Sequence, residues 1–144
     1  MEAYDASVYN ARILIEAGVV TSLHSDNNEI SSRMNWEAGK LLRTGLTHEQ
    51  ALSTVTNQAA KAVAIDSRVG SLEADKDADF VIWSGNPLSQ FTRAEQTWVD
   101  GRRYFSLEED AAMREQIDRE RTQLIQAILS ISGNGNMRDL RGSN

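Results

Sequence analysis

One carboxylate stands where an enzyme could use it. Asp26 follows closely on the β-branched run Val19–Leu23, which has the composition and length of a buried strand. Ligands of α/β proteins bind at the carboxyl ends of strands, so a carboxylate there can ligate a divalent cation and accept a proton from a bound water. Aspartate is also common in loops, and spacing alone favours an ordinary turn or helix-capping residue.

His24 is the second candidate at this position. It lies two residues before Asp26, so on an extended strand both side chains point to the same side and could line one cavity. A histidine with a purely structural partner is the commoner outcome. His48 is expected on the surface, at the first turn of a helix. Two histidines without any cysteine cannot form a closed structural zinc site unaided.

Other polar residues give weaker signals. Arg33, Asn35 and Glu37 could face a substrate, but a solvated helix face is favoured for each one singly. The three tryptophans are expected in the core. The sequence has no glycine-rich phosphate loop, nucleophile elbow, zinc-protease helix or calcium-binding loop. Residue chemistry alone therefore leaves the function open.

The elements that must position Asp26 belong to an α/β pattern. A helix over residues 4–17 is expected to end at Gly18, before the strand at residues 19–23. A second helix is expected to cover Trp36 to Arg43 and to stop at Gly45. A third begins at Thr47, which forms a capping box with Gln50 and carries an apolar face to residue 59. One parallel strand would leave both of its edges unpaired, so this part looks incomplete.

The pattern changes after residue 65. Residues 69–72 and 79–83 favour strands, and Asp100-Gly101 predicts a tight hairpin between residues 97–99 and 102–105. Residues 107–131 favour a helix with an apolar stripe, which we expect to pack on the chain's own strands. We therefore predict a barrel portion at 1–65, a β-sandwich portion at 66–106, a helix at 107–131 and a disordered tail at 132–144.

Length and composition exclude several classes. A chain of 144 residues is too short for a complete eight-fold β/α barrel, which needs about 250. Its formal net charge of −6, from 15 basic and 21 acidic residues, argues against nucleic acid as a partner. No apolar run is long enough to cross a membrane. The first residues lack the features of a leader. If the chain is part of a longer parent protein, that protein could lie in the cytoplasm or the periplasm.

Several stretches resemble the amidohydrolase superfamily over residues 4–105. Leu23–Asp26 is similar to its last barrel strand, and Gly45–Leu52 resembles its final barrel helix. The run Val69–Val81 is similar to the return into a small β-sandwich, and Gly70–Asp79 is the most specific part. The nearest branch is the one related to imidazolonepropionase. Three positions depart from the family pattern, all in structural turns. Gln58 stands where proline is usual, Asp75 where glycine is usual, and residues 63–64 where Leu-Gly is common.

The resemblance implies a fold and a chemistry. The fold would be the last part of a (β/α)8 metal-dependent hydrolase barrel, part of a β-sandwich and a C-terminal helix. Asp26 would be both metal ligand and catalytic proton acceptor, and His24 would line the substrate pocket. The parent would use a divalent metal, zinc, to hydrolyse C–N bonds of a small amide, cyclic amide or peptide. The other metal ligands of relatives have no counterpart here, so we expect this fragment to bind no metal and to be inactive alone.

Two alternatives stay open. The chain could be a non-catalytic α/β module that self-associates, because the surface left by a missing barrel would not be tolerated on a monomer. For this reason we expect a homo-oligomer. It could also be a helical interaction protein that uses residues 113–131 as a partner helix, which is the less favoured interpretation.

Overall fold

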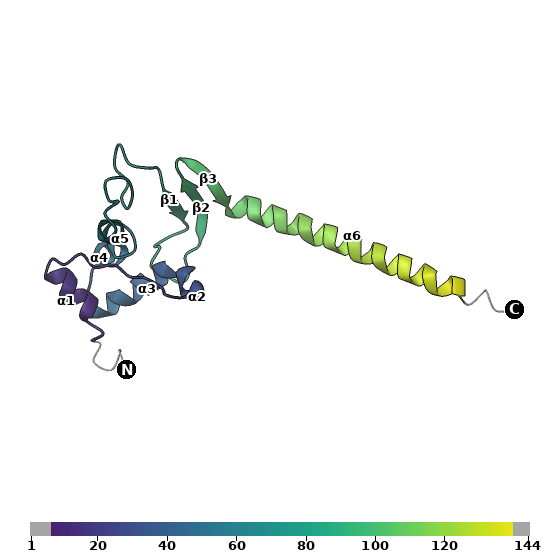
Figure 1. Ribbon diagram of the computed structural model, residues 1–144, viewed down its shortest axis with the longest axis horizontal. Coiled ribbons are helices and arrows are strands. Elements are labelled where there is room, and N and C mark those ends of the chain that lie inside the picture. The colour runs from purple at the N-terminus through teal and green to yellow at the C-terminus, as the bar shows by residue number, and fades with distance from the viewer. Residues whose placement is uncertain (1–6, 140–144) are drawn as a thin grey trace. The chain divides into compact units, whose positions relative to one another are not determined.

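The structure is a computed structural model that describes residues 7–139, with side chains described as far as residue 131. The chain divides into two units, one ending at Phe105 and the other beginning at Ser106. The first unit contains short helices followed by a small antiparallel sheet, and the second is a single long helix (Figure 1).

The first helix, α1 (Asn10–Glu16), ends as its sequence predicts. Gly18 adopts a left-handed conformation with φ of 78°, and its N–H donates to the carbonyl of Ile15 at 3.0 Å. The N–H of Val19 donates to the carbonyl of Leu14 at 2.9 Å. This pair of bonds satisfies carbonyls that the last helical turn leaves free. The predicted start is wrong for residues 7–9, which are not helical, and residues 4–6 lie outside the described residues.

The predicted strand at residues 19–23 does not form. Val19 and Val20 are about half exposed, Thr21 is buried, and the Leu23 N–H donates to the carbonyl of Thr54 at 3.1 Å. A strand exists only when a neighbour completes its hydrogen-bond ladder. No strand of residues 7–139 lies beside this segment, so its β-branched composition alone does not make it a strand.

Three short elements follow the loop at residues 24–27. They are α2 (Asn28–Ser31), α3 (Met34–Lys40) and the 3-10 helix η1 (Leu41–Thr44). The predicted stop at Gly45 is confirmed, since this residue has a φ of 93° that favours glycine. The predicted single helix therefore begins two residues early, at Met34, and tightens into a 3-10 turn before it ends.

The next helix is confirmed at its start but is shorter than predicted. In α4 (His48–Ser53) the Thr47 hydroxyl accepts from the Gln50 N–H at 3.1 Å, and the Gln50 side chain accepts from the Thr47 N–H at 2.9 Å. The chain then breaks before α5 (Asn57–Ala62). At the break, the hydroxyl of the fully buried Thr54 donates to the Ala51 carbonyl at 2.7 Å. Such hydroxyl bonds compete with the helical ladder.

The capping box gives a direct prediction. Replacing Thr47 with alanine should lower the free energy of unfolding by about 1 kcal/mol, because the Gln50 N–H loses its acceptor. Denaturant unfolding followed by circular dichroism measures the change. Thr56→Ala is the matched control, since Thr56 precedes α5 and its hydroxyl donates back to the Leu52 carbonyl without capping α5. An equal loss in both variants would contradict a capping role for Thr47.

The sheet contains three strands in the order β1-β2-β3: β1 (Phe80–Trp83), β2 (Ala94–Val99) and β3 (Arg102–Ser106). β1 and β2 are antiparallel, and the rings of Phe80 and Trp98 stack with centroids 5.6 Å apart. Asp100 and Gly101 have φ of 50° and 70°, which confirms the predicted tight hairpin. The strand predicted at residues 69–72 does not form.

The core of the first unit consists mainly of small side chains. Ala38, Ala51 and Leu88 form a buried cluster, on which five partly buried aliphatic side chains pack. Other larger apolar residues of this unit, such as Val63 and Leu72, are 65% and 75% exposed. Hydrophobic stabilisation scales with the apolar area removed from water. This unit therefore leaves much of its possible stabilisation unused.

The second unit is α6 (Leu107–Asp139). It was predicted to end near residue 131 but continues to Asp139, into the stretch predicted as a disordered tail. Residues 140–144 of that predicted tail lie outside the described residues. Packing of the α6 stripe on the chain's own strands stays a prediction. No helix within the described part of the chain is long and apolar enough to span a membrane.

Candidate functional site

His24 and Asp26 lie together, although the extended strand from which their common side was predicted does not form. The His24 Nδ1 is 3.2 Å from the Asp26 Oδ1. Both side chains are exposed, at 75% and 87%. The carboxylate is thus open to solvent. The pair can offer one carboxylate oxygen and one imidazole nitrogen to an approaching group.

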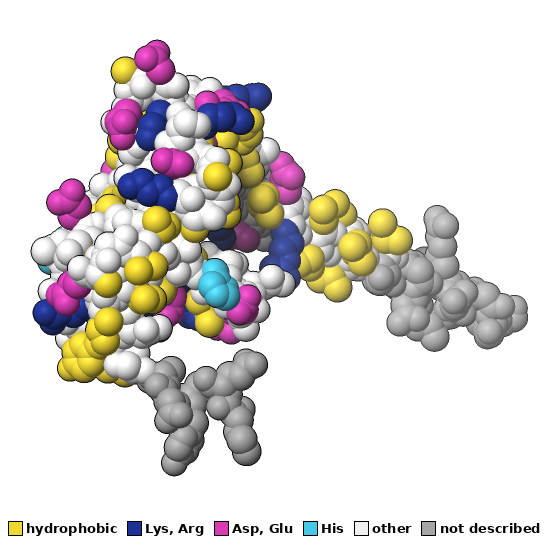
Figure 2. All heavy atoms as spheres, turned by 60° about the vertical axis from the view of Figure 1, so that its left-hand side comes forward, with side chains coloured by type: hydrophobic (Ala, Val, Ile, Leu, Met, Phe, Trp, Pro, Cys, Tyr) yellow, Lys and Arg dark blue, Asp and Glu magenta, His cyan; other side chains and the backbone are white. Residues whose placement is uncertain are grey.

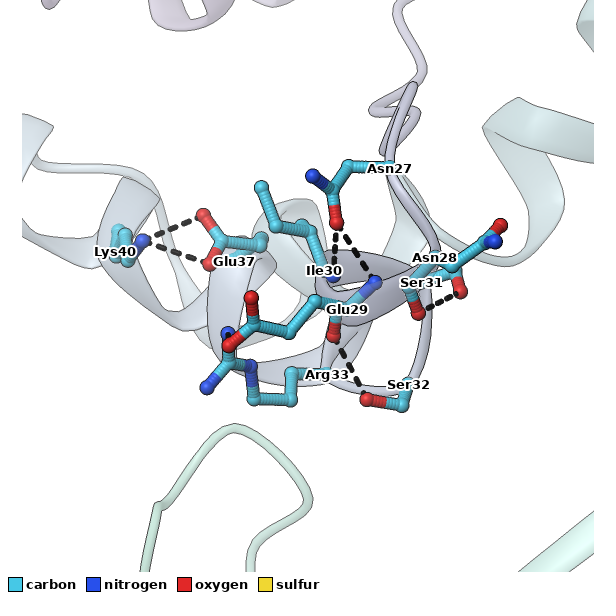
Figure 3. Close-up of polar contacts among 9 residues, drawn as sticks. All are labelled: Asn27, Asn28, Glu29, Ile30, Ser31, Ser32, Arg33, Glu37 and Lys40. Carbon is cyan, nitrogen blue, oxygen red and sulfur yellow. Dashed lines mark hydrogen bonds and ion pairs between the residues drawn. The ribbon is translucent and has the colours of Figure 1, made fainter.

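The backbone around Asp26 fixes where the carboxylate lies. Asp26 has a φ of 48°, in the left-handed region that aspartate tolerates better than most residues. On the following side, the Asn27 side chain accepts from the N–H groups of Glu29 and Ile30 at 2.7 and 3.3 Å (Figure 3). On the preceding side, the Leu23 N–H is bonded to the Thr54 carbonyl. The two candidate functional residues, His24 and Asp26, therefore occupy a short loop anchored at both ends.

The other polar candidates have structural partners. Figure 3 shows Glu37 paired with Lys40, with the lysine Nζ 2.6 and 2.7 Å from the two carboxylate oxygens. Arg33 lies 3.2 Å from the carboxylate of Glu29. Asn35 donates from Nδ2 to the Pro87 carbonyl at 2.6 Å. These contacts support the structural interpretation of all three residues.

The residues present do not complete a metal site. Among residues 7–131, no group of three or more His, Asp or Glu side chains could hold a metal ion. Catalytic zinc takes three protein ligands and a water. Asp26 and His24 are of the right chemical types, but together they supply at most two ligands. Any metal held by Asp26 would need further ligands from outside the described residues.

A separate apolar groove lies elsewhere in the first unit. It has a volume of about 930 Å³ and runs between helices α3–α5 and strand β1. Its walls include Val55, Ala59, Val69 and Phe80, and neither His24 nor Asp26 lines it. Sequence analysis did not predict a groove here, because helical spacing marks Val55 and Ala59 as core-facing without showing that nothing covers them. The lining is mainly hydrophobic and includes the acidic residue Asp79.

Comparison with known proteins identifies the class. A model described as the amidohydrolase family matches residues 4–104. "Amidohydrolase tasK" of Hapsidospora irregularis is 31% identical over 105 residues, covering 72% of this chain and 11% of its own length. An imidazolonepropionase of Acinetobacter baumannii is 44% identical over 75 residues, covering 49% of this chain and 18% of its own length.

A solved structure agrees with these matches. The crystal structure of an amidohydrolase from Thermotoga maritima superposes with a TM-score of 0.68 and 31% identity, over 74% of this chain and 28% of that one. The fold is thus a mixed α/β arrangement, with a small antiparallel sheet and a long C-terminal helix, that matches part of an amidohydrolase. The chain belongs to the amidohydrolase family, whose members are commonly metal-dependent, and it spans less than a third of these relatives.

Proposed function

We propose that this chain is the carboxy-terminal part of a metal-dependent hydrolase that cleaves C–N bonds of amides, cyclic amides or dipeptides. Asp26 is assigned two roles, ligation of a divalent metal (zinc) and acceptance of a proton, and His24 is assigned a contact with the substrate. A bound divalent metal supplies an activated water in such sites. The remaining ligands come from outside the described residues, so the chain alone is inactive.

The observation that carries the proposal is the family match together with the state of Asp26. The carboxylate is 87% exposed and has one near neighbour, His24, within the described residues. The helix-capping role that the sequence left open for Asp26 belongs to Asn27 in this loop. The loop leaves Asp26 free for a group that approaches from outside.

The first test uses the chain as it stands. Titration with one equivalent of Zn²⁺, in competition with a chromogenic chelator, should show no tight binding, because two ligands do not complete a site. A panel of amides and dipeptides should show no hydrolysis. Tight stoichiometric zinc binding, or hydrolysis that Asp26→Asn abolishes, would show that the chain is a complete site and contradict the proposal.

The second test supplies the missing ligands. In a chimera, residues 4–104 of this chain replace the matching part of the Thermotoga amidohydrolase, which supplies the other metal ligands. Hydrolysis by the folded chimera is then measured. We expect activity, and a loss of at least about 10²-fold with Asp26→Asn, since a base contributes that much. Asp75→Asn is the matched control, as Asp75 is another exposed aspartate at positive φ, 68°. Equal activity of the two variants would remove Asp26 from the site.

A further inference from the structure

The long helix α6 carries a stripe of exposed apolar side chains. The stripe consists of Met113, Ile117, Leu124, Ile128 and Ile131, which are exposed by 53–72%. Successive residues of an α-helix are about 100° apart, so these five fall within an arc of about 60°. Figure 2 shows hydrophobic side chains gathered on this helix. Apolar stripes of this kind are covered in folded proteins.

The stripe lies outside the part of the chain that the amidohydrolase family model matches. The family match ends at residue 104, and α6 begins at Leu107. Towards the C-terminal part of the stripe Ile125 and Leu129 widen the apolar surface, at 45% and 59% exposed. The hydrolase chemistry proposed above does not use this helix. The proposed hydrolase function therefore does not account for this apolar surface.

Two charges on either side of the stripe indicate the partner. Glu120 and Arg121 lie about 50° to opposite sides of its midline, halfway along it. Glu120 accepts a bond from Gln116 at 2.8 Å, and Arg121 forms no ion pair with any described residue. A surface that packs on the stripe should therefore place a cation beside Glu120 and an anion beside Arg121, at the same level along the helix. A second copy of α6 offers both.

We propose that α6 pairs with the α6 of a second copy of this chain, in parallel and in register, along this stripe. A two-fold axis parallel to the helices brings each stripe residue against its own counterpart. The same axis places Glu120 of one copy beside Arg121 of the other, twice per pair. In an antiparallel pair, each edge of the stripe would instead face the same edge of the other copy. Glu120 would then lie near Glu120 of the other copy, and Arg121 near Arg121. The charges thus select the parallel arrangement.

The test measures association of the 144-residue chain by analytical ultracentrifugation over a concentration series. We expect a dimer whose dissociation constant rises at least about tenfold with Leu124→Glu, since burial of one leucine is worth that much. Leu124 is 65% exposed in the single chain, so the variant should keep its helix, which circular dichroism checks. Gln126→Glu, on the opposite face of α6, is the matched control and should leave the dimer unchanged.

Charge exchange and crosslinking test the direction of pairing. Glu120→Arg and Arg121→Glu should each weaken the dimer several-fold, and the two together should restore it, because the pairs form again with reversed signs. Since the chain has no cysteine, Ile131→Cys gives a single thiol. Parallel copies bring the two thiols within disulfide distance, whereas antiparallel copies paired along the stripe keep them far apart.

Each other outcome overturns the proposal. A chain that stays monomeric at all concentrations has no such partner, and if Leu124→Glu then lowers its unfolding stability, the stripe packs on the same chain. A dimer that Leu124→Glu leaves intact uses another surface. A dimer without the Ile131→Cys crosslink, and unaffected by the single charge changes, is not parallel. None of these results bears on Asp26, so the proposed hydrolase function stands or fails separately.

Discussion

Replacing Gly70 with alanine should lower the free energy of unfolding of the first unit by about 3 kcal/mol. Gly70 has a φ of 93°, and a Cβ placed on it would lie 2.7 Å from the Cβ of Ala60 and 3.2 Å from the Thr56 carbonyl oxygen. The left-handed conformation costs a non-glycine residue about 1–2 kcal/mol. The forced contact with α5 adds about 1–3 kcal/mol, because Ala60 is buried and cannot withdraw. Denaturant unfolding followed by circular dichroism measures the sum.

Gly18→Ala is the matched control for this effect. Gly18 also has a positive φ, 78°, but nothing lies within 4 Å of its Cβ position. Alanine there carries the conformational cost alone, about 1–2 kcal/mol. The difference between the two variants isolates the close approach of the segment at residue 70 to α5. Equal destabilisation would mean that this approach is not formed in solution.

Gly39→Ala is expected to destabilise the chain by about 2 kcal/mol, against the usual trend, because a contact cost of about 3 kcal/mol exceeds the helical preference for alanine. In a helix interior, alanine is normally better than glycine by about 1 kcal/mol. A Cβ on Gly39 would lie 2.6 Å from the backbone oxygen of Leu88, however, and a carbonyl of the main chain cannot rotate away as a side chain can. Helix α3 would have to move away from the turn at residues 86–88, which the Asn35–Pro87 bond also holds.

Gly85→Ala provides the comparison in the same region. Its Cβ would have only one neighbour within 4 Å, the Thr92 Oγ1 at 3.4 Å, and its φ is not in the left-handed region. We expect a change within about 0.5 kcal/mol, as for an ordinary surface site. If Gly39→Ala proved stabilising while Gly85→Ala stayed neutral, the contact between α3 and Leu88 would be refuted.

Features decided by neighbouring residues could be predicted from the sequence. The Thr47–Gln50 capping box, the left-handed Gly18 and the Asp100-Gly101 turn depend on contacts within a few residues, and all three are confirmed. The strand at residues 19–23 depends on a partner strand distant in sequence, and a β-branched composition cannot supply one. The division of the predicted third helix at Thr54 was missed because two competing hydroxyl bonds leave little trace in a hydrophobic pattern.

The candidate site divides in the same way. The side chains of His24 and Asp26 are 3.2 Å apart, but the loop conformation with its positive φ at Asp26 brings them together, and not the extended strand that the sequence predicted. Their exposure could not be predicted, because it depends on which parts of the protein lie opposite the loop. The α6 stripe could be predicted from its helical spacing. A role for Glu120 and Arg121 could not, because their positions matter only if the helix pairs with a second copy.

The loop of residues 24–26 has little freedom to move. The Leu23–Thr54 bond holds one end, and the Asn27 cap of α2 holds the other. Three residues between fixed points reach no more than about 10 Å, so the carboxylate is confined before any other part of an enzyme approaches. Docking of that part would lose little conformational entropy at this loop. Slow amide hydrogen exchange at Leu23 would report such advance ordering, and rapid exchange would show that the loop is arranged only on assembly.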